Sequence, residues 1–128
     1  MQNRPPGRLA KRAVAIHRKL ARQARRRQHV VPGALLLEAR LRDTRGQTSK
    51  AETTLRRACQ SAIDLKMPPF EALARFDLAR MPSLSDEERR TNIERAIDLF
   101  ERMGYRWHLE RALALEQQIA RPQERKLL

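Results

Sequence analysis

The 128-residue sequence has few of the residues that mark several common kinds of domain. A single cysteine, Cys59, excludes an internal disulfide and a cysteine-rich zinc site. Only four glycines and five aromatic residues are present, which argues against a β-rich or loop-rich fold. No apolar run approaches the roughly 18 residues that a membrane-spanning helix needs. These scarcities favour a helical protein of a reducing compartment, and we expect it to be cytoplasmic.

Acidic residues are missing from the first 37 positions, because the first carboxylate is that of Glu38. Those positions hold ten Lys or Arg residues, whereas residues 38–128 hold eighteen basic and fifteen acidic side chains. The net charge of +13 is therefore concentrated toward the N-terminal end. An asymmetry of this kind indicates an anionic partner for that part of the chain, which could be nucleic acid, anionic lipid or an acidic protein face.

The apolar residues that are present recur at helical spacing, so the sequence predicts an all-α protein of about six helices. Breaks are expected at Pro32-Gly33, Gly46, Pro68-Pro69, Pro82 to Leu84 and Gly104. They separate helices at about 7–28, 34–45, 49–67, 69–81, 86–103 and 106–120. Capping boxes at Ser49 to Glu52 and at Ser85 to Glu88 predict two of the helix starts.

The first predicted helix is amphipathic, with one apolar stripe and a basic back. The stripe consists of Leu9, Ala13, Ile16, Leu20 and Ala24. Three interpretations stay open for this helix. Its stripe packs on the second helix and its basic back is solvated, or it docks on an acidic protein, or it contacts duplex phosphates or anionic lipid. Under the last of these, the candidate anion-binding residues are Arg22, Arg25, Arg26 and Arg27.

An internal repeat relates two of the predicted helices at an offset of 38 residues. "LRRACQSAIDLKM" at 55–67 aligns with "IERAIDLFERMGY" at 93–105. The alignment matches Leu55 with Ile93, Ala58 with Ala96, and Leu65 with Met103. Each unit therefore consists of a short helix, a turn and a longer helix.

This arrangement resembles the tetratricopeptide-repeat (TPR) family, and more closely its degenerate version in C-terminal regions of bacterial signalling ATPases and transcription regulators. Gly46 followed by Ala51, Leu55 and Ala58 matches the turn glycine and the small-large-small spacing of the family's second helix. "LFERMGYRWHLERA" at 99–112 looks like the phrase with which such solenoids often close. The resemblance implies antiparallel helix pairs in a right-handed solenoid.

The domain organisation expected from this resemblance has three parts. A basic amphipathic helix occupies residues 1–29, TPR-like repeats with a C-terminal capping helix occupy 30–120, and a disordered tail occupies 121–128. Two units are fewer than the three that repeat proteins usually need, so self-association through an open solenoid end is also expected.

Repeat solenoids usually hold another protein segment on a concave face, so the resemblance implies a non-catalytic protein-interaction module. It would serve as a scaffold or adaptor in signalling, either free-standing or as the tail of a larger bacterial regulator. The candidate partner-binding residues are Glu38, Arg42, Arg75 and Asp77. The rival function is nucleic-acid binding through the basic N-terminal helix.

No catalytic residue, cofactor or metal site is predicted, and we expect the chain not to be an enzyme. The three histidines share no ligand spacing with one another or with Cys59, which we expect to be a buried structural thiol. No glycine-rich phosphate loop is present. Tyr105 and Trp107 are expected to fill the core and cap the last unit, and the alternative is an exposed binding edge.

Overall fold

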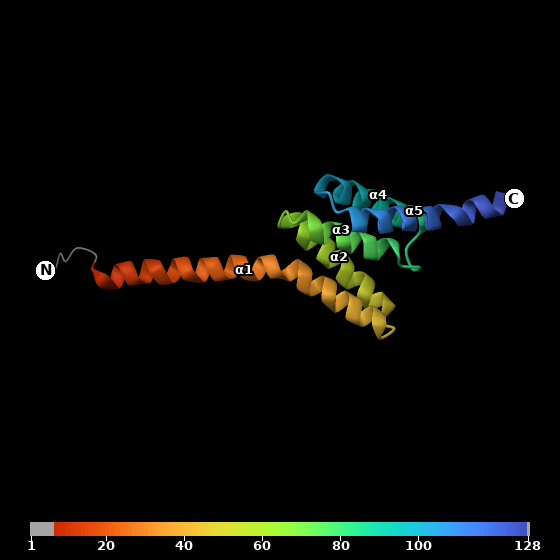
Figure 1. The fold of residues 1–128 in the computed structure, drawn as a ribbon. Coiled ribbons are helices and arrows are strands. Elements are labelled where there is room, and N and C mark those ends of the chain that lie inside the picture. The colour runs from red at the N-terminus through yellow and green to blue at the C-terminus, as the bar shows by residue number, and fades with distance from the viewer. Residues whose placement is uncertain (1–6, 128) are drawn as a thin grey trace. The chain divides into compact units, whose positions relative to one another are not determined.

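The computed structural model describes residues 7–127, in which every regular element is a helix (Figure 1). Side chains are described there except for Ala21, residues 23–29 and residues 120–127. The helices are α1 (Arg8–Thr44), α2 (Thr48–Asp64), α3 (Pro68–Ala79), α4 (Asp86–Met103) and α5 (Arg106–Leu127). The all-α fold class is confirmed for this part of the chain. Within residues 7–127 the chain divides after Val30 into two structural units, and each is described by itself.

In the first unit, α1 begins at Arg8 and has no acidic residue in its first turn. The large apolar side chains of the predicted stripe are exposed, with exposed fractions of 83% for Leu9, 55% for Ile16 and 58% for Leu20. The basic side chains on the other side, such as Lys11 and Lys19, are exposed as well. Residues 8–20 thus present both an apolar and a basic face.

The predicted helix break at Pro32-Gly33 is wrong, because α1 continues through both residues. A proline inside a helix removes one hydrogen bond and costs about 3 kcal/mol, so packing must offset this cost. Pro32 is fully buried, and a Cβ added at Gly33 would lie 3.2 Å from Cε1 of Phe70. Close packing of α1 on the Phe70 ring of α3 therefore favours the helix that local preference disfavours. The expected first and second helices are one element.

The second unit is built from consecutive helices, because α2 packs on α3, α3 on α4, and α4 on α5 (Figure 1). Two apolar clusters form its core, one on each side of α3. The first joins Leu36 and Ala39 of α1 to the alanine-rich face of α2. The second joins α3 to the larger buried side chains of α4 and α5, which include Ile93, Leu99, Phe100 and Ile119. In the first cluster the alanines Ala51 and Ala58 of α2 let the neighbouring helices approach closely.

Three helix ends share one hydrogen-bond pattern, in which a residue of positive φ follows the helix. The residues are Gly46 (φ 78°), Lys66 (φ 54°) and Gly104 (φ 71°). The next amide donates to the carbonyl five residues earlier, from Gln47 to Arg42, from Met67 to Ala62 and from Tyr105 to Phe100. The helix ends predicted at Gly46 and Gly104 are confirmed. Lys66 takes the same conformation without being a glycine.

The two predicted capping boxes have different outcomes. Ser85 is the N-cap of α4, since its hydroxyl accepts a hydrogen bond from the Glu88 amide at 3.2 Å. The box at Ser49 is wrong, because α2 begins at Thr48 and Gln47 is its N-cap, without a side-chain cap hydrogen bond. Ser49 lies inside the first turn of α2, so its hydroxyl does not occupy the capping position.

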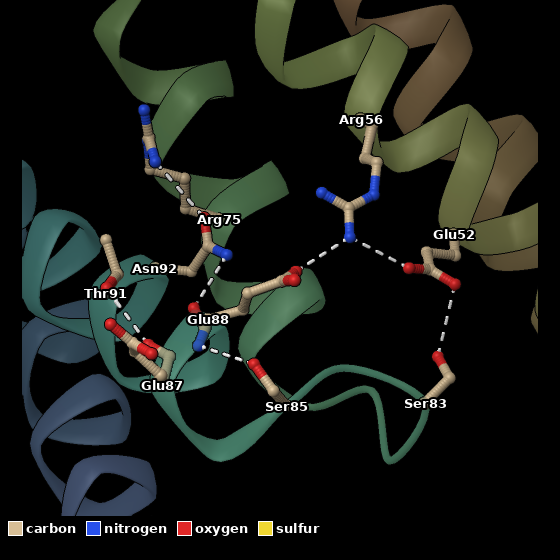
Figure 2. Close-up of polar contacts among 9 residues, drawn as sticks. All are labelled: Glu52, Arg56, Arg75, Ser83, Ser85, Glu87, Glu88, Thr91 and Asn92. Carbon is tan, nitrogen blue, oxygen red and sulfur yellow. Dashed lines mark hydrogen bonds and ion pairs between the residues drawn. The ribbon is translucent and has the colours of Figure 1, made fainter.

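Arg56 links the two longer helices of the predicted units (Figure 2). Its Nη2 lies 2.9 Å from a carboxylate oxygen of Glu52 in α2 and 2.9 Å from one of Glu88 in α4. Ser83 in the connecting loop donates to the same Glu52 carboxylate at 3.3 Å. The Glu88 carboxylate, and to a smaller extent the Glu52 carboxylate, raises the pKa of the Arg56 guanidinium above its ordinary value. The two helices are thus joined by side chains as well as through α3.

The last helix, α5, runs to Leu127, beyond the end that the sequence predicts at about residue 120. The disordered tail expected at residues 121–128 stays a prediction. Leu128 lies outside the described residues, and so do the side chains from Ala120 onward.

Candidate binding groove

A groove of about 630 Å³ opens in the second unit, and most of its lining comes from α1, α3 and α5. These helices place two kinds of side chain in it. The aromatic lining is Phe76, Phe100, Trp107 and His108, and the charged lining is Arg40, Asp43, Asp77, Arg80 and Arg111. Apolar surface beside a few charged groups is typical of sites that bind another molecule.

Arginine side chains stack on the aromatic rings of this groove. The guanidinium carbon of Arg111 lies 4.7 Å from the ring centre of Trp107 and 5.2 Å from that of Phe76. The guanidinium carbon of Arg80 lies 6.0 Å from the ring centre of Phe76. Stacking leaves the edge of a guanidinium free to donate hydrogen bonds. Within the described residues, neither Arg80 nor Arg111 forms an ion pair with a carboxylate.

Trp107 is the most exposed aromatic side chain of the groove, with an exposed fraction of 61%. Its ring meets that of His108 edge-on at 4.9 Å, and His108 stacks on the buried ring of Phe100 at 5.2 Å. Tyr105 is also exposed, with its ring 5.8 Å from His108. The expectation that Tyr105 and Trp107 fill the core is wrong, because both side chains are exposed, Trp107 in the first turn of α5 and Tyr105 just before it. The alternative of an exposed edge describes them better.

The four residues predicted to bind a partner do not form one site. Asp77 lines the groove, where its carboxylate accepts a hydrogen bond from Arg40 Nε at 2.8 Å. Glu38 and Arg42 are not among the lining residues and pair with each other at 2.8 Å along α1. Arg75 donates to Glu71 at 2.7 Å. It also donates to Asn92 at 3.2 Å, on the side of α3 that meets α4 (Figure 2).

The sequence interpretation missed several groove residues, among them Phe76, Arg80 and Arg111. A signal for them is present, because Phe76 with Arg80 and Trp107 with Arg111 are both aromatic–arginine pairs four residues apart. Side chains at this spacing lie next to each other on a helix surface. No comparable signal marks Arg40, whose place depends on how α1 packs against α3.

Of the candidate anion-binding residues in the first unit, Arg22 is exposed. The side chains of Arg25, Arg26 and Arg27 lie outside the described part of the structure. Their assignment to an anion-binding surface stays a prediction.

A smaller groove of about 370 Å³ lies where α2, α3 and α4 meet. Glu71 in its wall is buried, with an exposed fraction of 7%, and accepts hydrogen bonds from Arg75 at 2.7 Å and Arg95 at 3.4 Å. Two basic partners satisfy this buried carboxylate, as buried charges require. The arrangement is that of a structural ion pair rather than of an unsatisfied ligand.

Cys59 is a free thiol that is buried in the first core cluster, as the sequence predicts. Burial raises the pKa of this thiol above its ordinary value, so the thiolate is disfavoured. The described residues contain no cluster of His, Cys, Asp or Glu that could hold a metal ion. None of the helices in this part of the chain combines the length and the apolarity needed to cross a bilayer.

No protein-family model matches the chain, and comparisons with curated proteins and with solved structures find no match to it.

Proposed function

We propose that the second unit is a protein-interaction module that binds a segment of another protein in the groove between α1, α3 and α5. The observation that carries this proposal is the exposed Trp107 stacked on Arg111 beside Phe76. Exposed tryptophan and arginine are the residues that most often dominate binding energy at protein interfaces. The role is non-catalytic, and the chain would serve as an adaptor or as a module of a larger regulator.

A TPR-like solenoid is the architecture that fits this function, and the repeat supports it. Pairs of residues at an offset of 38 are buried in both α2 and α4, namely Leu55 and Ile93, Ala58 and Ala96, and Ala62 and Phe100. Lys66 and Gly104, also 38 apart, both follow their helices with positive φ. Under this proposal α1, α3 and α5 supply the inner surface of the solenoid, and α2 and α4 its outer surface.

The charge of the groove indicates the chemistry of its partner. Asp77 is already paired with Arg40. Among the described residues, the lining charges without an ion pair are two arginines, Arg80 and Arg111, and one carboxylate, Asp43. Arginine pairs favourably with carboxylates, and these two also offer stacked faces. A peptide segment that carries acidic side chains next to an apolar or aromatic one is therefore the partner we expect.

A selection from a displayed random-peptide library tests this function with the whole chain as bait. Peptides that emerge are titrated against the wild type and against a Trp107→Ala, Arg111→Ala variant. We expect the variant to lose about thirtyfold or more in affinity, as interface anchors typically do. Tyr105→Ala, Arg106→Ala is the matched control, because it removes an exposed aromatic and an arginine outside the groove lining. Affinities that are equal in wild type and groove variant, or no enriched peptide, would refute the proposal.

The rival function, nucleic-acid binding through the basic helix, stays a prediction. It is tested by measuring duplex DNA and RNA affinity as a function of salt, for the wild type and for a variant with Arg22, Arg25, Arg26 and Arg27 changed to Ala. Loss of four phosphate contacts should flatten the log–log salt dependence by about 3.6 for B-form DNA. An unchanged slope would show that these arginines do not contact phosphate.

A further inference from the structure

The helix over residues 8–22 places its Lys and Arg side chains on one side and an apolar stripe on the other. At about 100° per residue, its six basic residues fall within an arc of about 120°. They are Arg8, Lys11, Arg12, Arg18, Lys19 and Arg22. On the same geometry the stripe of Leu9, Ala13, Ile16 and Leu20 occupies an arc of about 60° on the other side of the helix. A helix divided in this way has two surfaces with different preferences.

Both surfaces are exposed where the structure describes them. Leu9, Ile16 and Leu20 are each more than half exposed, and the basic residues from Arg8 to Lys19 are exposed with them. No acidic residue occurs before Glu38, so this stretch of sequence contains no internal partner for its positive charge. A partner of this helix must therefore supply negative charge and an apolar environment together.

Three occupants can be compared on charge and apolar surface. A second copy of the helix would cover the stripe but would bring ten like charges against ten, because residues 1–37 contain no acid. Duplex nucleic acid would pair with the basic arc but would leave Leu9, Ile16 and Leu20 in water. An anionic bilayer surface meets both demands, since its phosphates lie directly above its acyl chains.

We propose that residues 8–22 bind the surface of an anionic lipid bilayer with the helix axis parallel to the surface. The stripe enters the boundary between headgroups and acyl chains. The basic arc reaches the lipid phosphates, and the Lys and Arg stems cover apolar surface on the way. The helix lies on the membrane rather than across it, which agrees with the absence of a spanning helix from the described residues.

The test uses the whole chain and vesicles that differ only in charge. Vesicles of phosphatidylcholine with about 30% phosphatidylglycerol are compared with pure phosphatidylcholine vesicles by flotation, because anionic lipid should add about fivefold in partitioning for each basic residue near the surface. Strong binding to the anionic vesicles and weak binding to the neutral ones is the expected result. Equal binding to both, or no binding to the anionic vesicles, would overturn the proposal.

Substitutions that leave the net charge unchanged distinguish lipid binding from nucleic-acid binding. Leu9→Gln, Ile16→Gln, Leu20→Gln should weaken binding to anionic vesicles more than tenfold, because three apolar side chains leave the acyl boundary. The matched control is Leu37→Gln, Leu41→Gln, Leu113→Gln, which changes three exposed leucines of the second unit and should alter binding less than about twofold.

Duplex DNA provides the opposing outcome. The proposal predicts that the Leu9, Ile16, Leu20 variant binds DNA as well as the wild type while it loses vesicle binding. If that variant bound vesicles as well as the wild type does, the stripe would not take part in membrane binding. If the chain bound duplex DNA more tightly than vesicles, and if the substitutions in the stripe weakened neither interaction, the helix would be assigned to nucleic-acid binding. Helicity and the thermal midpoint of each variant, measured by circular dichroism, show that the second unit is still folded.

Discussion

The longer helices of the two predicted units, α2 and α4, bury side chains of similar size at two corresponding positions and of very different size at a third. At the third position α2 has Ala62 and α4 has Phe100, and both side chains are buried. The residues at the ends of α4 also suit their positions better than those at the ends of α2. α4 has a serine N-cap and a glycine of positive φ after its last turn, whereas α2 has Gln47 and Lys66 at these places.

The two helices therefore share a backbone pattern, but one favours close approach of its neighbours and the other buries more apolar surface. Small buried residues in α2 allow close approach to its neighbours, but they remove little apolar surface from water. Large buried residues and well-formed ends make α4 the part of the second unit from which we expect most of its stability. Each prediction below changes one side of this comparison, in order of decreasing expected effect.

Phe100→Ala is expected to lower the free energy of unfolding by about 3–5 kcal/mol, because a large and fully buried side chain leaves a cavity. Urea unfolding followed by circular dichroism measures it. Leu113→Ala, at an exposed position of α5, is the control and should change the free energy by less than about 0.5 kcal/mol. A loss below about 1 kcal/mol for Phe100→Ala would mean that α4 is not the main source of stability.

Exchanging the residue types at the two turns should shift stability in opposite directions. Gly104→Ala places a Cβ on a residue with φ of 71°, and no atom lies within 4 Å of that Cβ, so the expected loss of about 1–2 kcal/mol is purely conformational. Lys66→Gly relieves the same conformation at φ 54° and should raise the free energy of unfolding by up to about 1 kcal/mol. Thermal unfolding of both variants tests the pair. Shifts of the same sign would contradict it.

Cys59 gives the repeat that contains α2 a buried titrating group, whereas the repeat that contains α4 has Ile97 at the corresponding position. Burial raises the pKa of this thiol above the ordinary 9.0, so the unfolded chain releases the proton first. The free energy of unfolding should therefore fall as pH rises above about 9, by at most about 1.4 kcal/mol per pH unit. Cys59→Ala should show a shallower decline in reducing buffer. Parallel pH profiles for the two proteins would exclude this cause.

Most helices of the second unit could be predicted from apolar spacing and turn residues, because both are local signals. The break at Pro32-Gly33 was predicted wrongly because the local cost of proline is outweighed by packing on Phe70, which is distant in the sequence. The N-cap predicted at Ser49 is wrong for a related reason. A serine three residues before a glutamate marks a helix start only when the chain has not already become helical there.

The groove could be predicted only in part, since Asp77 alone among the four expected residues lines it. Helical spacing indicates which residues share a face, but it does not indicate which faces of three helices meet. Trp107 and Arg111 illustrate this limit, because their sequence is equally compatible with a buried cap and with an exposed edge. Packing of α5 on α4 decides between the two.

The bridge from Arg56 to Glu52 and Glu88 has a consequence for the alignment of the helices it joins. Its side chains are partly exposed, so it adds little to the free energy of unfolding. Sliding α4 by one turn, about 5.4 Å, would bring either Asn92 or the end of the loop near Leu84 opposite Arg56 in place of Glu88. Neither of these residues has a carboxylate. The bridge can therefore form in only one longitudinal register of α4 against α2.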